Sequence, residues 1–174
     1  IVGNNRLDYT NQLSTEALAA IREFLPQKKA HMETVRAALR LKAYSANYDF
    51  DKGYAMLLPE LAKLKREAQF FAVEALDAIA SKDNARAITA ISEITRVGDC
   101  LKNDPLLIGQ LVRIACYSIA INTTERLLKE QTLTVAECTQ LDEVMDGLKQ
   151  DDGMKRALVG ERTFAWALLD GPVT

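Results

Sequence analysis

The longest apolar stretch of the chain runs from Pro105 to Glu130, and its pattern predicts one helix of about seven turns. Asp104 is placed to cap this helix and Pro105 to open it. Two adjacent apolar stripes form a face too broad for a helix that rests on one neighbour. We therefore expect this helix at the centre of an all-helical domain. The stripes contain Leu107, Leu111, Ile114, Ser118, Ile121 and Leu128, and beside them Ile108, Val112, Ala115 and Ile119.

Two further lines of the same helix are small or polar. The small line marks where another helix could approach closely, and the polar line forms one continuous strip. Arg113 is the charge on that strip that interrupts the apolar run. The small line contains Gly109, Cys116, Ala120 and Thr123, and the polar strip contains Gln110, Arg113, Tyr117 and Thr124.

Helical periodicity continues on both sides of this element, and no segment sustains the period-two alternation of a strand. The fold class is therefore all-α, an antiparallel bundle or a short stack of αα-hairpins with six to seven helices. The pairs 58–80/85–102 and 105–130/134–149 recur at roughly 45 residues, a period typical of helical repeats. We treat 1–174 as a single domain with an irregular lead-in over 1–13. The other expected helices cover 14–25, 27–44, 58–80, 85–102, 134–149 and 154–169.

Local signals refine several of these helices. Pro26 is expected to end the first helix and to start the second. Lys63 and Glu67, four residues apart, predict an exposed stripe on 58–80. Thr134 and Glu137 have the spacing of a capping box. Residues 45–53, SANYDFDKG, form the main predicted loop.

The composition is that of an ordinary globular domain. The chain has 174 residues, 48 % apolar and 26 % charged, with a formal net charge of −2. The basic residues are dispersed, which argues against binding of nucleic acid or of a membrane by this domain itself. Because the chain begins at Ile1, we expect a piece of a longer protein from which an upstream anchor has been removed.

The residues that most often carry catalysis are sparse. Cys100, Cys116 and Cys138 lack a C-x-x-C spacing, and we interpret them as small core residues, although one pair could still be oxidised. His31, the single histidine, shares a face with Val35 and is interpreted as a packed or flanking residue. No nucleophile elbow or H-E-x-x-H motif accompanies it, so we predict no metal and no cofactor.

Two acidic segments have the residue types of a cation site. Residues 47–53 carry alternating oxygen donors, but they miss the calcium-loop register because the twelfth position is Leu58 rather than Glu. We therefore interpret them as turn and capping residues. A second patch lies around the last connection and is interpreted as a solvated face. It contains Asp142, Glu143, Asp146, Asp151 and Asp152.

One candidate polar site remains, between the central helix and the last helix. Glu161 falls on a line with Met154, Leu158, Ala165 and Leu168, which we expect to face the core. A charge on a buried face needs a partner, because an isolated one costs several kcal/mol. The alternatives are an ion pair that specifies the fold, a ligand-binding or catalytic pair, and simple exposure. The candidate site contains Arg113, Tyr117, Glu161 and Arg162.

Three pieces of the chain carry a resemblance: LLPELAKLKREAQFFAVEA (57–75), NDPLLIGQLVRIA (103–115) and the triplet at 160–162, Gly-Glu-Arg. With these the chain resembles a group of uncharacterised bacterial proteins, helical and usually exported or anchored by one N-terminal segment. The resemblance implies a helical fold and a periplasmic or exported location, with the cytoplasm as the alternative. It implies no activity.

The first functional hypothesis is a non-enzymatic interaction or scaffolding module that receives another protein chain, because stacked hairpins commonly offer such surfaces. The second is binding of a small apolar or amphipathic ligand between helices, lined by the central helix. The third is a hydrolase or transferase that uses Glu161 and Arg113. An exposed apolar patch would favour the first hypothesis, and an enclosed cavity would favour the second.

Overall fold

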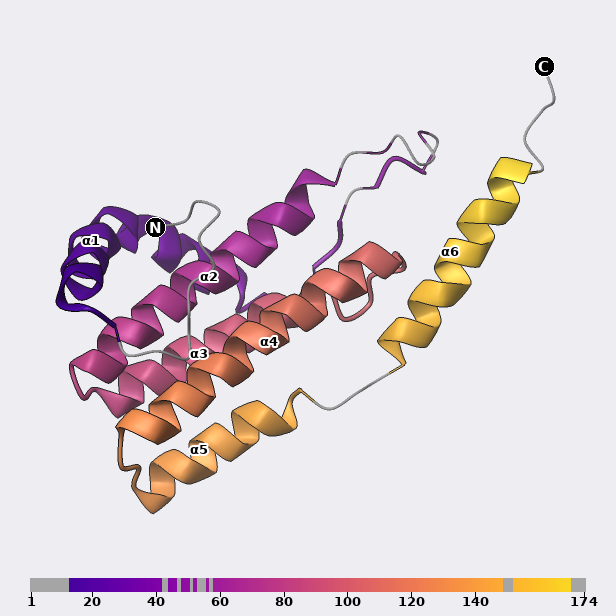
Figure 1. Cartoon of the computed structure of the whole chain (residues 1–174). Coiled ribbons are helices and arrows are strands. Elements are labelled where there is room, and N and C mark those ends of the chain that lie inside the picture. The colour runs from indigo at the N-terminus through magenta and orange to yellow at the C-terminus, as the bar shows by residue number, and fades with distance from the viewer. Residues whose placement is uncertain are drawn as a thin grey trace.

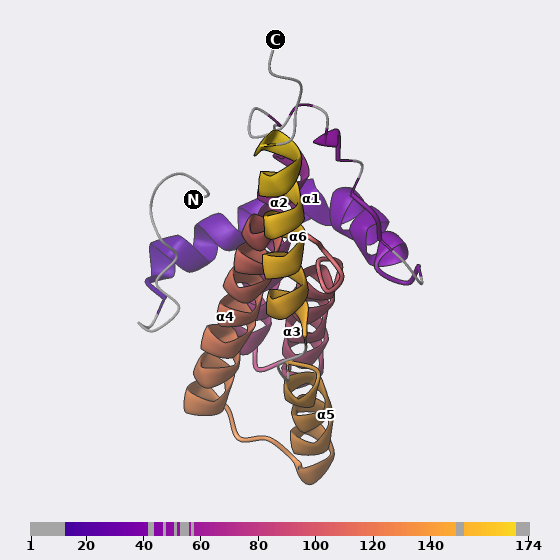
Figure 2. The same ribbon diagram turned by 90° about the vertical axis from the view of Figure 1, so that its right-hand side faces the viewer.

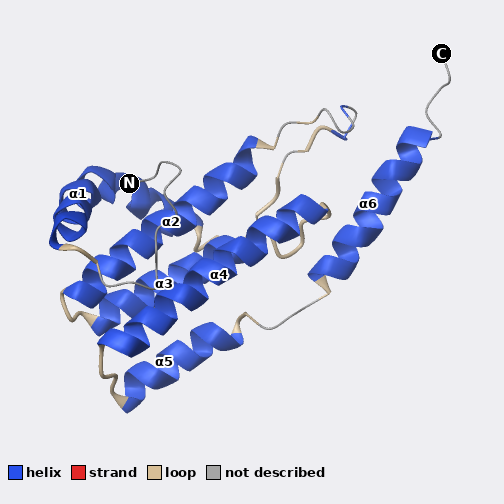
Figure 3. Cartoon of the chain, in the orientation of Figure 1, coloured by secondary structure: helices blue, strands red, loops and turns tan. Residues whose placement is uncertain are grey.

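The structure, a computed structural model, describes residues 13–41, 44–46, 48–50, 52, 56, 58–148 and 152–169. Within these ranges it contains six helices and no strand, so the predicted all-α class is confirmed (Figures 1 and 3). The helices are α1 (Thr15–Ala38), α2 (Pro59–Ala80), α3 (Asn84–Asp99), α4 (Leu107–Glu130), α5 (Val135–Asp146) and α6 (Gly153–Leu169).

Helices α2, α3 and α4 lie side by side and alternate in direction (Figure 1). Helix α1 crosses over α2, and the view in Figure 2 shows that its axis runs across those of the other helices. Helix α5 packs mainly on α3. Helix α6 contacts α4 near the start of α4 and then extends away from the bundle (Figures 1 and 2).

The core lies between α2 and α3. Apolar side chains of both helices are buried, with Phe71 and Ala75 on α2 and Ile91 and Ile94 on α3 fully enclosed. The prediction that the 105–130 helix forms the centre is wrong. Helix α4 packs on α3 and α2 with one side, and its other side is exposed.

Helix α1 continues through Pro26, so the predicted break at this residue is also wrong. A proline ring within a helix removes one backbone hydrogen bond, here to the carbonyl of Arg22. Pro26 and Arg22 both lie on the exposed side, where water can satisfy that carbonyl. Ile21 and Met32, on the opposite side, are buried against the bundle and hold the two halves of α1 in place.

The turn between α2 and α3 is tight. Lys82 has a φ of 59°, and the backbone N–H of Asp83 donates to the carbonyl of Ala78 at 2.9 Å. These features are typical of a helix that ends on a left-handed residue. The Asp83 side chain then caps α3 by accepting from the Arg86 backbone N–H.

The capping box at the start of α5 is confirmed. The Glu137 carboxylate accepts from the Thr134 backbone N–H, and the Thr134 hydroxyl accepts from the Glu137 backbone N–H. Helix α5 nevertheless packs more closely on α3 than on its neighbour in sequence, α4. The second predicted hairpin is therefore splayed, as Figure 2 shows.

Candidate functional site: the two faces of helix α4

The outward face of α4 is apolar. Ile108, Leu111, Ile114, Ile121 and Leu128 are 46 %, 50 %, 49 %, 44 % and 55 % exposed. These residues include most of the broadest apolar stripe predicted from the sequence. Since that stripe was expected to contact helices on both sides, its exposure is the largest correction that the structure makes. We call these five residues the α4 stripe.

The inward face of α4 is the small line, and this prediction is confirmed because Gly109, Cys116, Ala120 and Thr123 are all buried. Small side chains let α4 approach α3 closely. At Gly98 of α3, an added Cβ would meet the Tyr117 ring at 2.7 Å. Close approach of the two backbones therefore requires the small face to point inward, and this rotates the α4 stripe toward solvent.

Gln110, Arg113 and Thr124 of the polar strip are also buried, and Tyr117 is partly buried. Gln110 satisfies backbone groups at the α3–α4 connection. The Gln110 amide donates to the carbonyl oxygens of Leu101 and Asp104 at 2.8 and 3.0 Å. The Arg113 Nη1 donates to Gln110 Oε1 at 3.4 Å. Buried backbone carbonyls require such partners, so these hydrogen bonds reinforce the orientation that the small face imposes.

The network continues from Arg113 toward the surface. Arg113 Nε donates to the Tyr117 hydroxyl at 2.9 Å, and the Tyr117 hydroxyl donates to Asp99. The Arg113 guanidinium also lies over the Tyr117 ring, 5.1 Å from its centroid. Burial, followed by the hydrogen bond to Asp99, raises the pKa of Tyr117 well above its ordinary value. Arg113 and Tyr117, two members of the candidate polar site, are therefore in contact.

Glu161 meets α4 at a different point. Its Oε1 accepts a hydrogen bond from the backbone N–H of Leu107 at 2.9 Å, in the first turn of α4. The sequence assigned that capping role to Asp104, whose carboxylate instead accepts from Leu106 N–H and from the Tyr48 hydroxyl. Helix α4 begins at Leu107, two residues later than predicted. An ion pair between Glu161 and Arg113 stays a prediction.

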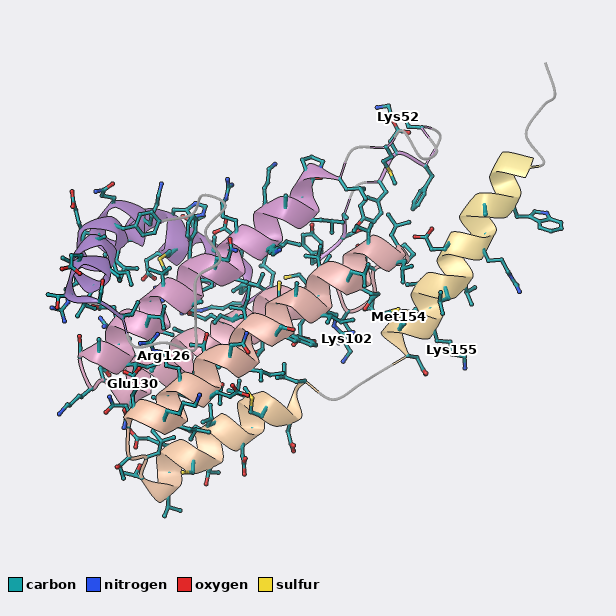
Figure 4. All side chains as sticks on the ribbon, viewed as in Figure 1. Lys52, Lys102, Arg126, Glu130, Met154 and Lys155 are labelled. Atoms are coloured by element: carbon teal, nitrogen blue, oxygen red, sulfur yellow. The ribbon has the colours of Figure 1, made fainter. Side chains whose placement is uncertain are left out.

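The side of α6 that packs on α4 is small. Gly153 and Ala157 are buried, and a Cβ added to Gly160 would meet the Pro105 carbonyl oxygen at 2.2 Å. The predicted inward line of α6 is therefore wrong at Met154 and Leu158, which are exposed; the side chain of Leu168 lies outside the described residues. Arg162 is exposed as well. Figure 4 shows Met154 at the end of α6 nearer the bundle.

A group of ion pairs between α1, α2 and α3 was not predicted. Arg36 of α1 is its hub: Nη2 lies 2.5 Å from Glu74 Oε2, and Nε lies 2.6 Å from Glu93 Oε1. Glu93 is buried, and desolvation raises its pKa even though Arg36 opposes that shift. Glu93 could have been identified from the sequence, because it is a carboxylate on an otherwise apolar helix face. The same feature identified Glu161 as a candidate.

Two other carboxylates of α2 belong to the same set of contacts. Asp77 is buried and binds Arg22 at 3.2 Å and Arg86 at 2.5 Å. Glu67 lies 2.7 Å from Nε2 of His31. The predicted exposure of Glu67 is therefore wrong, and His31 is a flanking residue at the edge of the α1–α2 contact. These pairs fix α1 across the bundle.

A cavity of about 440 Å³ lies beside this group of ion pairs. Apolar side chains of α1, Leu25 and Met32 among them, share its lining with Arg36, Glu74 and Asp77. Every one of these three charged groups has an opposite charge at hydrogen-bonding distance. The arrangement accounts for the docking of α1, and it differs from the predicted ligand site because its lining comes from α1, α2 and α3 rather than from α4.

The cysteines and the two acidic segments are the remaining candidates from the sequence. Cys116 is buried and Cys100 is partly buried, but Cys138 is exposed, so the core interpretation fails for Cys138; all three thiols are free. Asp49 pairs with Lys52 at 2.9 Å, while Asn47, Asp51 and Gly53 lie outside the described residues. Asp142, Glu143, Asp146 and Asp152 are exposed, and Asp151 is not among the described residues.

At the C-terminal end of α4, Arg126 is buried and its Nε lies 2.8 Å from Glu130 Oε1; Figure 4 labels both residues. In the part of the chain that the structure describes, no group of His, Cys, Asp or Glu side chains gathers as a metal site would. Within the same ranges, no helix combines the length and apolar content that crossing a bilayer requires.

No protein-family model, no curated protein and no solved structure matches the chain. The evidence for function therefore comes from the two faces of α4.

Proposed function

We propose that this domain is a non-enzymatic interaction module whose binding surface is the α4 stripe, and that the stripe receives an amphipathic helix of a protein partner. The observation that supports it is the exposure of five large aliphatic side chains along one helix that also buries two arginines and a glutamine. Contiguous apolar patches of this kind on a folded domain typically mark interaction sites.

The spacing within the stripe favours a helical partner. Leu107, Ile114, Ile121 and Leu128 follow one another at intervals of seven, and Leu111 precedes Ile114 by three. The first four occupy one core position of a heptad pattern, and Leu111 occupies the other, where Ser118 and Glu125 follow it. The apolar residues of these positions form a seam that suits a second helix. A seam suits a helix better than a compact ligand, because it runs the whole length of α4.

The charge distribution of α4 is consistent with this partner. From Leu107 to Thr124 the helix contains one charged residue, Arg113, and that side chain is buried. The outward seam is therefore uncharged until Glu125. A helix with its own apolar a and d positions would remove this surface from water without leaving a buried charge unpaired. The resemblance described above supports the further proposal that the domain is the soluble part of an exported or anchored protein.

The experiment uses a fluorescent peptide of three heptads with leucine at every a and d position, titrated with the protein and followed by anisotropy. We expect saturable binding to the wild-type protein. The Ile121→Gln variant should bind at least tenfold more weakly, because glutamine places an amide in the seam.

The matched control is Leu41→Gln. Leu41 is 72 % exposed and lines a cavity beside α1, α2 and α3 rather than α4. Its substitution should leave peptide binding unchanged. Absence of saturable binding by the wild-type protein, or equal weakening by both substitutions, would contradict a binding role for the α4 stripe. Circular dichroism confirms that each variant retains its helical content.

A further inference from the structure

Two neighbouring cavities lie where α1 and α3 end and α2 begins. One has a volume of about 280 Å³ and is lined by α1, α2 and α3. The other has a volume of about 530 Å³ and is lined by the segment that follows α1 and by the α3–α4 connection. Tyr44 and Cys100 line both, so one ligand can extend from one cavity into the other. Their combined size is typical of a small-molecule site.

The smaller cavity, which we call the apolar cavity, suits an aliphatic chain. Its described lining contains one charged side chain, Glu67, and that carboxylate is paired with Nε2 of His31 at 2.7 Å. Much of the aliphatic lining is only partly buried, and Leu41 is 72 % exposed. An aliphatic chain bound here would remove this surface from water. The aliphatic lining residues are Val35, Ala38, Leu39, Leu41, Leu64 and Val97.

The larger cavity combines aromatic rings with carboxylates, and we call it the aromatic cavity. Its rings belong to Tyr44, Tyr48 and Phe50. The rings of Tyr48 and Phe50 meet edge to face, with centroids 5.8 Å apart. Asp99 and Asp104 line the same cavity. Aromatic faces attract organic cations, and quaternary ammonium groups are typically bound among several such rings.

The charge of the aromatic cavity also favours a cation. Asp99 and Asp104 contribute two negative charges to the described lining, and Lys102 contributes the one positive charge. Asp104 is buried, and its carboxylate is held in place by two hydrogen bonds. Burial raises the pKa of Tyr44, and nearby negative charges, Glu60 and Asp104 among them, raise it further. The field at this ring is therefore negative.

Asp99 keeps the capacity to face a ligand. The Tyr117 hydroxyl donates to its Oδ1, and the Arg113 guanidinium lies 3.9 Å from the same oxygen. A carboxylate offers about four acceptor positions on its two oxygens. The Asp99 side chain is 45 % exposed, so that a cation in the cavity can approach it from the solvent side.

We propose that the two cavities form one binding site for an amphiphile that has an aliphatic chain and an organic cation as its head group. The chain lies in the apolar cavity, and the head lies among the rings and carboxylates of the aromatic cavity. None of the described lining residues belongs to α4. The site is therefore distinct from the α4 stripe and from the ligand site that the sequence predicted along the central helix.

The first measurement is an isothermal titration with decyltrimethylammonium, kept below the concentration at which it forms micelles. We expect saturable binding of one molecule per chain. Decyl sulfate has the same chain and an anionic head, and it should bind about tenfold more weakly or worse because it meets the carboxylates. Octyltrimethylammonium should also bind about tenfold more weakly, because each buried methylene strengthens binding about fourfold. Absence of saturable binding, or equal affinities for the cationic and anionic probes, would overturn the proposal.

Two adjacent alanines of α1 test where the chain lies. Ala38 lines the apolar cavity, Ala37 does not, and both are exposed. Ala38→Phe fills the cavity and should weaken binding of decyltrimethylammonium about tenfold or more, because overpacking excludes the chain. Ala37→Phe, the matched control, should bind as the wild type does. Equal affinities in the two variants, or loss of binding in Ile121→Gln of the α4 stripe, would show that the chain lies elsewhere.

Phe50→Leu tests the aromatic cavity. Phe50 is 49 % exposed, and leucine keeps an apolar side chain but removes the ring. The substitution should weaken binding of decyltrimethylammonium about fivefold, because a ring attracts a cation, and it should leave decyl sulfate unaffected. Equal weakening for the two probes would show that the ring contributes apolar area rather than recognition of a cation.

Cys100 reports occupancy of the site without any substitution. Its thiol is partly buried and lines both cavities, whereas Cys138 lies on α5 and is exposed. Saturating decyltrimethylammonium should slow the alkylation of Cys100 by iodoacetamide and leave the rate at Cys138 unchanged. An unprotected Cys100, or an equal change at both thiols, would overturn the site. Such a failure leaves the α4 stripe untouched, because the heptad-peptide titration tests that surface separately.

Discussion

Glu161 of α6 caps the first turn of α4: its Oε1 lies 2.9 Å from the backbone nitrogen of Leu107, 54 positions earlier in the chain. The first backbone N–H groups of a helix have no partner within the helix, and an anionic oxygen also suits the positive end of the helix dipole. This contact therefore ties the position of α6 to the start of α4, beside the α4 stripe.

The contact predicts an unequal response to two substitutions. Glu161→Ala removes the acceptor and should lower the free energy of unfolding by about 1 kcal/mol. Glu161→Gln keeps an oxygen acceptor and should cost less than half as much. Urea denaturation measures both values. Equal losses in the two variants would show that the negative charge, rather than the hydrogen bond, accounts for the stabilisation.

The ion pairs that dock α1 give a second prediction. Arg36→Met leaves Glu74 and Glu93 without their shared cation, and breaking a partly buried pair of this kind should cost about 3 kcal/mol. Arg22→Met is the matched control, because its side chain is 55 % exposed and exposed pairs contribute less than about 1 kcal/mol. Similar losses in the two variants would show that burial does not govern these contacts.

The deficit of Arg36→Met should also depend on pH. Burial already raises the pKa of Glu93 above its ordinary 4.5, and removal of Arg36 takes away the group that opposes this shift. A carboxyl whose folded-state pKa is raised favours the folded state when protonated, and that contribution is lost as pH rises through the folded pKa. Relative to wild type, the variant should therefore be less impaired at pH 4 than at pH 7, as denaturation at both pH values would reveal.

The free thiols give a third prediction. Burial raises the pKa of Cys116 from 9.0 to about 12, so the thiol stays protonated and shielded at neutral pH. Cys138 is exposed. Iodoacetamide followed by mass spectrometry should label Cys138 rapidly, and Cys116 only at the rate of unfolding. Because the raised pKa favours the folded state when the thiol is protonated, Cys116 should also reduce stability between pH 9 and 12. Rapid labelling of native Cys116 would contradict its burial.

The sequence predicted those parts of the fold in which a single physical effect, such as apolar burial or helix capping, determines the structure. In α2 and α3 the apolar side chains are buried apart from a few such as Leu64, because these helices have neighbours on both sides and apolar burial alone orients them. The capping box of α5 was equally predictable, because both of its hydrogen bonds join residues three positions apart.

The orientation of α4 was not predictable in the same way, because two local rules conflict there. Apolar burial favours Ile114 and Ile121 inward, whereas close helix approach favours Cys116 and Ala120 inward. The choice is made by tertiary contacts, above all the hydrogen bonds of Gln110 to carbonyls of the α3–α4 connection. The capping of α4 by Glu161 escaped prediction for the same reason, since its partners are distant in sequence.

The most direct test of this account compares two adjacent residues of α4. Ala120 is fully buried, and Ile121 is 44 % exposed. Ala120→Gln forces a larger polar side chain into the core and should lower the free energy of unfolding by about 3 kcal/mol or more. Ile121→Gln should lower it by less than about 1 kcal/mol. The reverse order, with Ile121→Gln the more damaging substitution, would show that the apolar stripe of α4 faces the core and would contradict the interaction surface proposed for it.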